Sequence, residues 1–454
     1  MRPLKIGISG VRGIVGETLT PELVVDFACA FATHVESGTV LIARDTRASG
    51  RMLSAAVRSA LVSCGCNVVD LGVSPTPVLQ FETRRSAASG AIAITASHNA
   101  AEWNALKFIN ADGVALSFEE AEEVLDIYHQ RDFVRAPWDK LGTLDDAHGA
   151  EERYLDALVH FLDQPAIASA ALRVVVDTCN GATCTVVRQL MNRLGVDAVL
   201  INDQPTAHFS HNPEPTPANM EQVASVMVPL KADVGFGLTS DGDRVAVVTE
   251  NGDALSEECT LLLAADYVLS RQAGTVVTNL STTAAIEDMA RTYGGGRVIR
   301  TRVGQGHVVR KSLEENAILA GEGSGGVALF DFQPAFDALA TMGIILESLA
   351  KRAKTVSEIV ASFPRYTMIK QKIPCPPEIS YAVVEKVASG FETDALDVTD
   401  GVRYADADGW VHVRSSATEP LIRIIAESRT EQKAHELADK ARRLSLGAMR
   451  PYQV

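Results

Sequence analysis

A serine lies at the end of a short apolar run in the first quarter of the chain. Residues 91–95 predict a buried strand, and residues 95–99 (Thr-Ala-Ser-His-Asn) predict the turn that holds Ser97 at its carboxyl end. That edge of an open α/β sheet is where such proteins hold their reacting groups. A hydroxyl there, flanked by polar side chains, is a candidate nucleophile. On this segment alone, an ordinary Ser/Asn turn explains the residues better.

Two aspartates separated by one glycine form a second polar segment. The sequence Thr239-Ser240-Asp241-Gly242-Asp243-Arg244 lies between two predicted strands, at residues 234–236 and 245–248. Carboxylates at this spacing can converge on a hard cation such as Mg²⁺ and leave positions open for substrate oxygens. Arg244 could then hold a phosphoryl oxygen. A surface Asp/Gly turn is the alternative, but the flanking strands favour a metal site.

Two loops nearer the carboxyl terminus carry groups suited to a sugar and a phosphate. Residues 321–326 (Gly-Glu-Gly-Ser-Gly-Gly) would let a polyhydroxylated ligand approach Glu322 closely, although on its own a plain glycine-rich turn is the better explanation. Residues 414–420 (Arg-Ser-Ser-Ala-Thr-Glu-Pro), with Arg423 in the next strand, offer hydroxyls and guanidinium groups that can enclose a phosphate. The alternative there is a polar hairpin loop, but the clustered hydroxyls and arginines favour an anion site.

Two further polar turns have no settled role. Residues 44–50 (Arg-Asp-Thr-Arg-Ala-Ser-Gly) follow a predicted strand, and Arg12 lies between glycines in residues 9–13. Each turn could supply an anion ligand, and each could equally be a solvated or salt-bridged turn.

The elements that would position these groups repeat three times along the chain. Each unit is a strand ending in Asp or Asn, a turn rich in Ser, Thr and Gly, a helix, a glycine and another strand. The predicted strand, helix and second strand are residues 40–45, 52–63 and 68–69; 173–177, 186–194 and 199–201; and 275–279, 284–293 and 298–299. This order is typical of a βαβ unit, so the sequence predicts three related α/β domains with mixed, largely parallel sheets.

The carboxyl-terminal part has a different pattern. Closely spaced strands at residues 402–404, 410–413 and 421–425 are followed by an amphipathic helix at about 430–445. Strands joined without helices between them predict a smaller antiparallel α+β domain. The expected domains are therefore residues 1–150 with Ser97, 151–255 with the Asp-Gly-Asp loop, 256–370 with Glu322, and 371–454 with Arg414.

Composition narrows the class of partner. The 454 residues are 46% hydrophobic and 22% charged, which is ordinary for a globular protein, and the net charge of −15 argues against a nucleic-acid partner. The seven cysteines are scattered without a C-x-x-C pair, which favours reduced thiols in a cytosolic protein. No apolar run is long enough for a signal core or a membrane span, so we expect a cytoplasmic protein without a membrane partner.

Taken together, the segments resemble those of the α-D-phosphohexomutases. The resemblance runs from residues 7–13 (Gly-Ile-Ser-Gly-Val-Arg-Gly) to Arg423, with all four signature segments in the family's order. It implies four domains around a central cleft and the reversible interconversion of hexose 1-phosphates and 6-phosphates. It also implies a phosphoserine enzyme, a 1,6-bisphosphate intermediate, Mg²⁺ as cofactor and hexose 1,6-bisphosphate as activator. The sugar stays open between phosphoglucosamine mutase and phosphoglucomutase/phosphomannomutase activity, and a homodimer is one option for assembly.

The resemblance also implies roles for single residues. Ser97 would carry the phosphate beside its motif neighbour His98, with Lys107 as general acid/base and Arg12 in the active site. The other implied groups are the Mg²⁺ ligands Asp241, Asp243 and an oxygen of phosphorylated Ser97, with Thr239 at the position of a third aspartate; the sugar-binding Glu322 and Ser324; and the phosphate-binding Arg244, Arg414, Ser416, Thr418 and Arg423.

Departures from the family pattern keep alternatives open. Thr239 replaces the first aspartate of the metal loop, Gly326 replaces a histidine found in many bacterial members, and Ala100-Ala101 replaces the usual proline. A weaker metal site and no histidine acid/base at position 326 would follow. The alternatives are a metal-dependent sugar phosphatase that uses the same serine, and a catalytically impaired sugar-phosphate-binding homologue.

Overall fold

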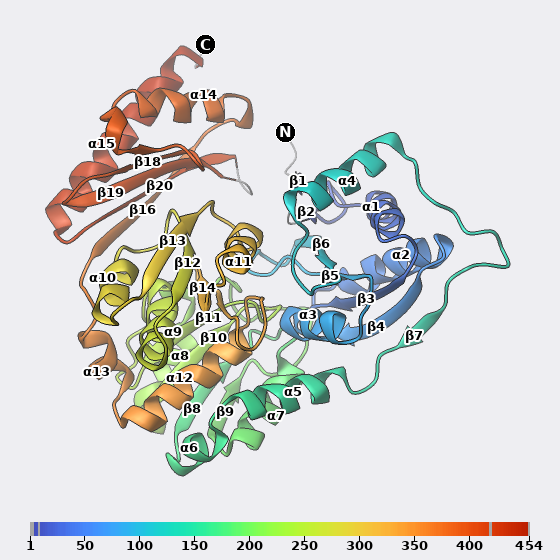
Figure 1. The fold of residues 1–454 in the computed structure, drawn as a ribbon, viewed down its shortest axis with the longest axis horizontal. Helices are drawn as coiled ribbons and strands as arrows, with labels where there is room; N and C mark the ends of the chain where they lie inside the picture. The colour runs from blue at the N-terminus through green and yellow to red at the C-terminus, as the bar shows by residue number, and fades with distance from the viewer. Residues whose placement is uncertain (1–3, 8–9, 417–419, 453–454) are drawn as a thin grey trace.

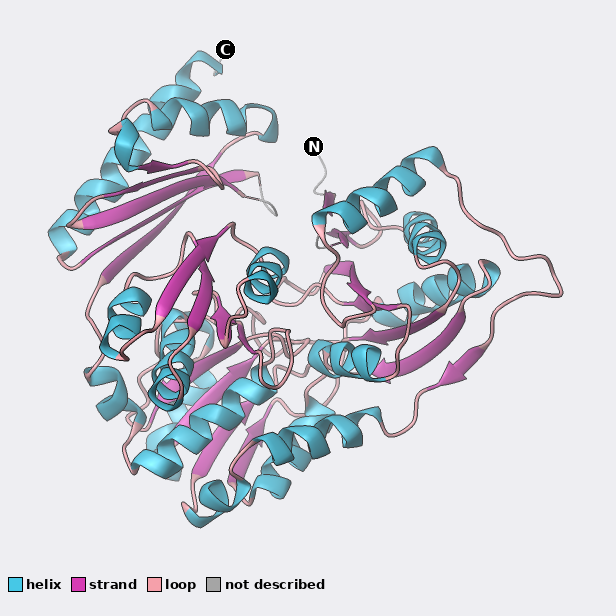
Figure 2. Ribbon diagram, in the orientation of Figure 1, coloured by secondary structure: helices cyan, strands magenta, loops and turns pink. Residues whose placement is uncertain are grey.

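The computed structural model describes residues 4–7, 10–416 and 420–452, which form four sheets with helices against them (Figures 1 and 2). Each sheet is built from one stretch of the chain, and we number the four resulting domains in chain order. Among the described residues, no helix has the length and apolar character needed to cross a membrane. The domain boundaries near residues 150, 255 and 370 stay a prediction.

Domain 1 contains a seven-stranded mixed sheet in the order β1-β2-β6-β5-β3-β4-β7. Its strands are β1 (Lys5–Gly7), β2 (Gly10–Ile14), β3 (Thr39–Arg44), β4 (Asn67–Val73), β5 (Gly90–Ile94), β6 (Trp103–Asn110) and β7 (Leu144–Asp146), and its helices are α1 (Pro21–His34), α2 (Gly50–Ser63), α3 (Thr76–Arg85) and α4 (Phe118–Gln130). The strand β5 is central and buried throughout, which explains its uninterrupted apolar sequence.

Domains 2 and 3 each contain a four-stranded mixed sheet, in the orders β11-β10-β8-β9 and β13-β12-β14-β15. Domain 2 has β8 (Arg173–Asp177), β9 (Asp197–Ile201), β10 (Val234–Leu238) and β11 (Val245–Thr249), with α5 (Ala150–Phe161), α6 (Gln164–Ser169), α7 (Cys184–Leu194) and α8 (Glu221–Leu230). Domain 3 has β12 (Thr275–Asn279), β13 (Arg297–Thr301), β14 (Leu319–Gly321) and β15 (Val327–Leu329), with α9 (Glu258–Arg271), α10 (Ala285–Thr292), α11 (Gln305–Glu314), α12 (Ala338–Arg352) and α13 (Val356–Ala361). One continuous apolar core joins Phe236 of domain 2 to Leu346 of domain 3, so these two domains form a common base.

Domain 4 is the smaller α+β unit that the sequence predicts, with its own apolar core. Its sheet is antiparallel throughout, in the order β16-β20-β19-β18-β17. The strands are β16 (Thr367–Pro374), β17 (Leu396–Asp397), β18 (Val402–Ala405), β19 (Gly409–Ser415) and β20 (Leu421–Ser428), and the helices are α14 (Pro377–Ala388) and α15 (Glu431–Met449). The strand β16 was not predicted from the sequence, because this edge strand carries Lys370, Gln371 and Lys372 in place of an apolar run.

The loops that carry the candidate residues converge where the first three sheets end. The loop after β5 contacts the loop between β10 and β11 through Ser97 and Asp241. That second loop contacts the loop after β14, because Arg244 forms an isolated bridge with Gly326 and the next N–H, of Val245, donates to the Gly325 carbonyl at 3.1 Å. The carboxyl edges of three sheets therefore meet at one place, as open α/β folds favour.

Candidate active site

Ser97 lies in a strained turn directly after β5. Its φ of +53° is in the left-handed region, which is uncommon for a residue that has a Cβ. The Ser97 N–H donates to Thr95 Oγ1 at 3.0 Å, and only 3% of Ser97 is exposed. Ser97 therefore lies at the edge of the sheet, where the sequence predicts it. Its backbone conformation is one that the surrounding residues must stabilise.

The Asp-Gly-Asp loop joins β10 to β11 and is anchored by helices of both neighbouring domains. The Thr76 N–H, at the start of α3, donates to the Asp241 carbonyl at 2.9 Å, and the Ala338 N–H, at the start of α12, donates to the Gly242 carbonyl at 3.0 Å. Gly242 has a φ of +76°, and a Cβ there would lie 2.8 Å from a threonine side chain, so the turn requires glycine. Domains 1 and 3 thereby fix Asp241 and Asp243, whose exposed fractions are 1% and 2%.

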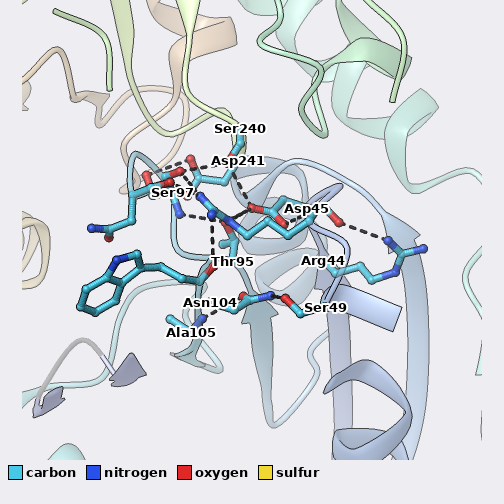
Figure 3. Close-up of polar contacts among 12 residues, drawn as sticks. Arg44, Asp45, Ser49, Thr95, Ser97, Asn104, Ala105, Ser240 and Asp241 are labelled. Atoms are coloured by element: carbon cyan, nitrogen blue, oxygen red, sulfur yellow. Dashed lines mark hydrogen bonds and ion pairs between the residues drawn. The ribbon is translucent and has the colours of Figure 1, made fainter. Parts of the chain in front are cut away.

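Four polar side chains from domains 1 and 2 converge at this point (Figure 3 shows Ser97 and Asp241). The Ser97 hydroxyl donates to Asp241 Oδ1 at 3.1 Å. The Lys107 Nζ, from β6, lies 2.8 Å from Asp241 Oδ2 and 2.6 Å from Asp243 Oδ2. Burial opposes the charged form of Lys107, but the two carboxylates outweigh it and raise its pKa, so the lysine is an ammonium ion.

The two carboxylates are suited to hold a metal cation. They already enclose an ammonium group, and Asp243 Oδ1 is buried without a hydrogen-bond partner. Buried oxygens are normally paired, so an unpaired one indicates a ligand. The Thr239 hydroxyl donates to Asp241 Oδ1 at 2.9 Å and accepts the Arg244 N–H at 3.2 Å, so it orients this aspartate. No group of three or more His, Cys, Asp or Glu side chains suited to a metal exists in the described chain, so further ligands would come from Ser97, substrate or water.

Positive side chains gather beside the Ser97 turn. An Arg12 terminal nitrogen donates to Asn99 Oδ1 at 2.7 Å. Burial, together with repulsion from Arg244, lowers the pKa of Arg12 to about 10. Burial and the same two arginines lower the pKa of His98 well below its usual value, so this histidine is neutral. Two neighbouring guanidinium groups repel each other, and an anion between them relieves that repulsion, which makes Arg12 and Arg244 a candidate phosphate subsite.

Glu322 and Ser324 lie together in the loop after β14. Glu322 is 4% exposed, and its Oε1 accepts the Asn279 side-chain amide at 2.8 Å and the Gly304 N–H at 2.6 Å. These bonds fix the carboxylate and leave its Oε2 for a ligand donor. The Ser324 Oγ is buried without a partner. An acceptor and an unpaired hydroxyl in one loop suit a sugar.

The end of the same loop explains the missing histidine. A Cβ at Gly326 would lie 2.3 Å from the Phe336 ring, so no side chain fits there in this conformation. Gly326 also forms an isolated antiparallel bridge with Arg244, which ties the sugar loop to the metal loop. The expectation that position 326 supplies no acid or base therefore has a steric reason.

The candidate phosphate-binding residues of domain 4 lie at the β19–β20 hairpin. Arg414 and Arg423 are paired residues across the two strands, and the Ser416 N–H donates to a backbone carbonyl of β20 at 2.9 Å. The Arg414 Nε is buried without a partner. Burial lowers the pKa of Arg414, and the carboxylates of Asp400 and Glu322 oppose that change. Thr418 lies outside the described residues.

The groups behind Ser97 that hold its turn were not assigned this role from the sequence. Asp45, Arg47 and Ser240 are at most 1% exposed, and they contact one another or the turn. Figure 3 shows Asp45 and Ser240 beside Ser97. The sequence left residues 44–50 open between an anion ligand and a salt bridge. The structure has the salt bridge, with Arg47 Nε 2.9 Å from Asp45 Oδ2.

His307 was also missed. It lies in the first turn of α11, and burial together with the charge of Arg302 lowers its pKa, while Glu322 opposes the shift. The sequence offers only a histidine three residues after Gly304 as a signal for it, because no helix was predicted there.

Four family models match consecutive parts of the chain. The phosphoglucomutase/phosphomannomutase alpha/beta/alpha domain I model matches residues 3–135, domain II matches 152–252, and domain III matches 256–366. The model of the phosphoglucomutase/phosphomannomutase C-terminal domain matches residues 368–444. These segments are in the order in which the four sheets follow one another along the chain.

Individual proteins match over nearly the whole length. A phosphoglucomutase/phosphomannomutase of Thermococcus kodakarensis is 38% identical over 439 residues, covering 95% of this chain and 96% of its own. A probable phosphoglucosamine mutase of Pyrococcus abyssi is 34% identical over 449 residues, covering 98% of each chain. The crystal structure of a phosphoglucomutase/phosphomannomutase family protein from Burkholderia thailandensis has a TM-score of 0.84 at 26% identity and covers 98% of this chain and 97% of its own. The expected fold and phosphohexomutase function are confirmed, and the chain belongs to the phosphoglucomutase/phosphomannomutase family.

Proposed function

We propose that Ser97 carries the phosphoryl group that this mutase transfers to a hexose monophosphate. The observation that carries the proposal is the buried Ser97 hydroxyl, held 3.1 Å from Asp241 beside the Lys107 ammonium group. A phosphoserine adds about −1.5 to −2 charge near neutral pH. Lys107, Arg12 and Arg244 supply positive charge at this place, so the site is built for a phosphorylated serine.

Asp241 and Asp243 are the residues that would hold Mg²⁺, with Thr239 orienting Asp241. The unpaired Asp243 Oδ1 and the cation already enclosed between the carboxylates support this assignment. When bound, Mg²⁺ would neutralise charge on the transferring phosphoryl group. The loop itself contributes a fixed, nearly water-free position for that charge, because both aspartates are buried.

In the first transfer, the P–O bond to Ser97 breaks and a P–O bond to the sugar hydroxyl oxygen forms. The sugar hydroxyl loses one proton and the Ser97 oxygen gains one, so a single proton must pass between them. Lys107 is placed to relay it, because its ammonium group lies against the same Asp241 carboxylate that accepts the Ser97 hydroxyl. The reverse transfer, from the other end of the bisphosphate, returns the phosphoryl group to Ser97.

The non-reacting end of the substrate is assigned to domains 3 and 4. Glu322 would accept hydrogen bonds from sugar hydroxyls, and Ser324 would contribute a second polar contact. Arg414, with Arg423, Ser416 and Thr418 of the same hairpin, would bind the distal phosphate. A site that binds either phosphate away from Ser97 would accept both orientations of a 1,6-bisphosphate. Free hexose 1,6-bisphosphate would accordingly activate the enzyme by phosphorylating Ser97.

Intact-mass analysis and a coupled mutase assay test the proposal together. Protein incubated with hexose 1,6-bisphosphate and Mg²⁺ should carry stoichiometric phosphate on Ser97 and convert glucose, mannose or glucosamine 1-phosphate to its 6-phosphate. Ser97→Ala should lose both properties. Ser63→Ala, which removes a hydroxyl of α2 that bonds to the Ala60 carbonyl, is a matched control and should keep both.

Two outcomes would overturn the proposal. Turnover of Ser97→Ala at the unsubstituted protein's rate would remove Ser97 from the chemistry. Release of inorganic phosphate faster than formation of the isomerised sugar phosphate would show a phosphatase that uses the same serine.

A further inference from the structure

Arg47 is a fully buried arginine whose hydrogen-bonding capacity is used up by the Ser97 turn and one carboxylate. Its Nε donates to Asp45 Oδ2 at 2.9 Å. One terminal nitrogen donates to the Ser97 and Asn99 carbonyls at 2.8 and 2.7 Å, and the other donates to the Ala100 and Trp103 carbonyls at 2.6 and 3.1 Å. A guanidinium group has five N–H donors, so none remains for substrate.

Asp45 makes this arrangement electrically neutral and extends it to Thr95, the first residue after β5. Its Oδ2 accepts the Thr95 hydroxyl at 2.6 Å, and Thr95 Oγ1 in turn accepts the Ser97 N–H at 3.0 Å (Figure 3). Its Oδ1 accepts the Arg47 backbone N–H at 3.0 Å. The two side chains are each 0% exposed, so the pair contributes geometry to the turn and little net charge.

Ser240 connects the same group to the metal loop of domain 2. Its hydroxyl lies 3.0 Å from Asp45 Oδ2 and 2.9 Å from the Ser97 carbonyl, so its one proton bridges two acceptors of domain 1. Ser240 is the residue immediately before Asp241, which accepts the Ser97 hydroxyl. The Arg47 Cζ also lies over the ring of Phe209 of domain 2, 4.9 Å from the ring centroid.

We infer that Arg47, paired with Asp45, is a positioning residue for Ser97: it holds the turn and, through Ser240, sets the distance between the nucleophile and the metal loop. The inference rests on the proposed function, in which Ser97 receives and gives up the phosphoryl group. Ser97 adopts a left-handed φ of +53°, which the turn would not keep without such contacts.

The reaction needs a turn of fixed position, because Ser97 alternates between a neutral hydroxyl and a dianionic phosphate. A loop held only by the serine side chain would shift when that charge changes. Arg47 binds four backbone carbonyls, whose positions do not depend on the state of the Ser97 oxygen. The same attack geometry is therefore available in both half-reactions, and a displacement of about 1 Å would cost on the order of 100-fold in rate.

Arg47→Lys is the informative variant, because lysine keeps the charge but cannot direct five donors. We expect kcat to fall about 100-fold and KM for the sugar phosphate to change by less than about threefold. Amide hydrogen exchange of residues 95–103 should become at least about tenfold faster. Arg58→Lys, which alters a partly exposed ion pair with Asp70 in the same domain, is the control and should change none of these.

Ser240→Ala serves if Arg47→Lys does not fold, since it removes one hydroxyl only. It should lower kcat about threefold to tenfold with KM unchanged.

An unaltered kcat in a folded Arg47→Lys variant, or a loss of activity that comes from a higher KM, would overturn the inference. Wild-type protein without phosphate on Ser97 would refute the proposed function instead. Amide hydrogen exchange tests the positioning role even then. An unchanged exchange rate at residues 95–103 in Arg47→Lys would overturn that role by itself.

Discussion

Arg47 in domain 1 is fully buried and Arg414 in domain 4 is half-buried, and the hydrogen-bonding surroundings of the two arginines are opposite. Arg47 donates to one carboxylate and four backbone carbonyls, all within 3.1 Å. Arg414 has one described hydrogen bond, at 3.5 Å to the carbonyl of the next residue, and its Nε has no partner. The first arginine is part of the protein's own framework, and the second has donors left for an anion.

This difference separates two kinds of region around the site. The Ser97 turn and the Asp-Gly-Asp loop are interlocked by side chains and by helix starts from domains 1 and 3, so their groups are fixed before substrate binds. The β19–β20 hairpin of domain 4 belongs to a domain with a separate core. An arginine with satisfied donors therefore indicates positioning, and one with unsatisfied donors indicates binding.

The largest expected effect is in the fixed region. Asp241→Asn removes the carboxylate that accepts the Ser97 hydroxyl and pairs with Lys107, so kcat should fall about 1,000-fold. The coupled mutase assay at saturating Mg²⁺ measures it, with Asp145→Asn on the exposed β7 as control. A variant that retained a tenth of the activity would contradict the assigned role of Asp241.

Arg414→Lys tests the binding side of the comparison. Lysine loses the forked donors that suit a phosphate, so KM for the sugar phosphate should rise about 10- to 100-fold while kcat changes little. This split is the reverse of the one expected for Arg47→Lys. If both variants lowered kcat equally with unchanged KM, the distinction between the two arginines would be wrong.

Gly326→Ala tests how tightly the loop between the two regions is fitted. A Cβ would lie 2.3 Å from the Phe336 ring, so unfolding free energy should fall by about 1–2 kcal/mol. Chemical denaturation measures this. Gly7→Ala is the control, because a Cβ at Gly7 would meet no atom within 4 Å. Gly16→Ala is less suitable, because the φ of +81° at Gly16 would strain any side chain there. Equal stability of the Gly326 variant and the unsubstituted protein would contradict the steric account.

The smallest expected effect concerns Thr239. Thr239→Val keeps the shape but removes the hydroxyl that orients Asp241, so the Mg²⁺ concentration for half-maximal activity should rise about threefold. Thr239→Asp should lower it by adding a third carboxylate. Titration of both variants with Mg²⁺, by activity and by calorimetry, checks the pair. A loss of all activity in Thr239→Val would show that Thr239 does more than orient its neighbour.

Local patterns were enough to predict most of the fold. The predicted helices and strands of the three βαβ units lie within a few residues of α2, α7, α10 and their flanking strands, because apolar periodicity and glycine stops are local signals. The placement of Ser97 beside Asp241 depends on contacts 144 positions apart, which the order of motifs indicated only through the family resemblance. The role of Asp45 and Arg47 could not be predicted, since a salt-bridged and an anion-binding turn have the same composition.

Site-resolved mass spectrometry of the chain after incubation with hexose 1,6-bisphosphate and Mg²⁺ tests the central claim most directly. The account predicts stoichiometric phosphate on Ser97, retained in Arg414→Lys at saturating bisphosphate and formed about 100-fold more slowly in Arg47→Lys. Phosphate on another residue, or none on Ser97 in a preparation that interconverts sugar phosphates, would contradict it.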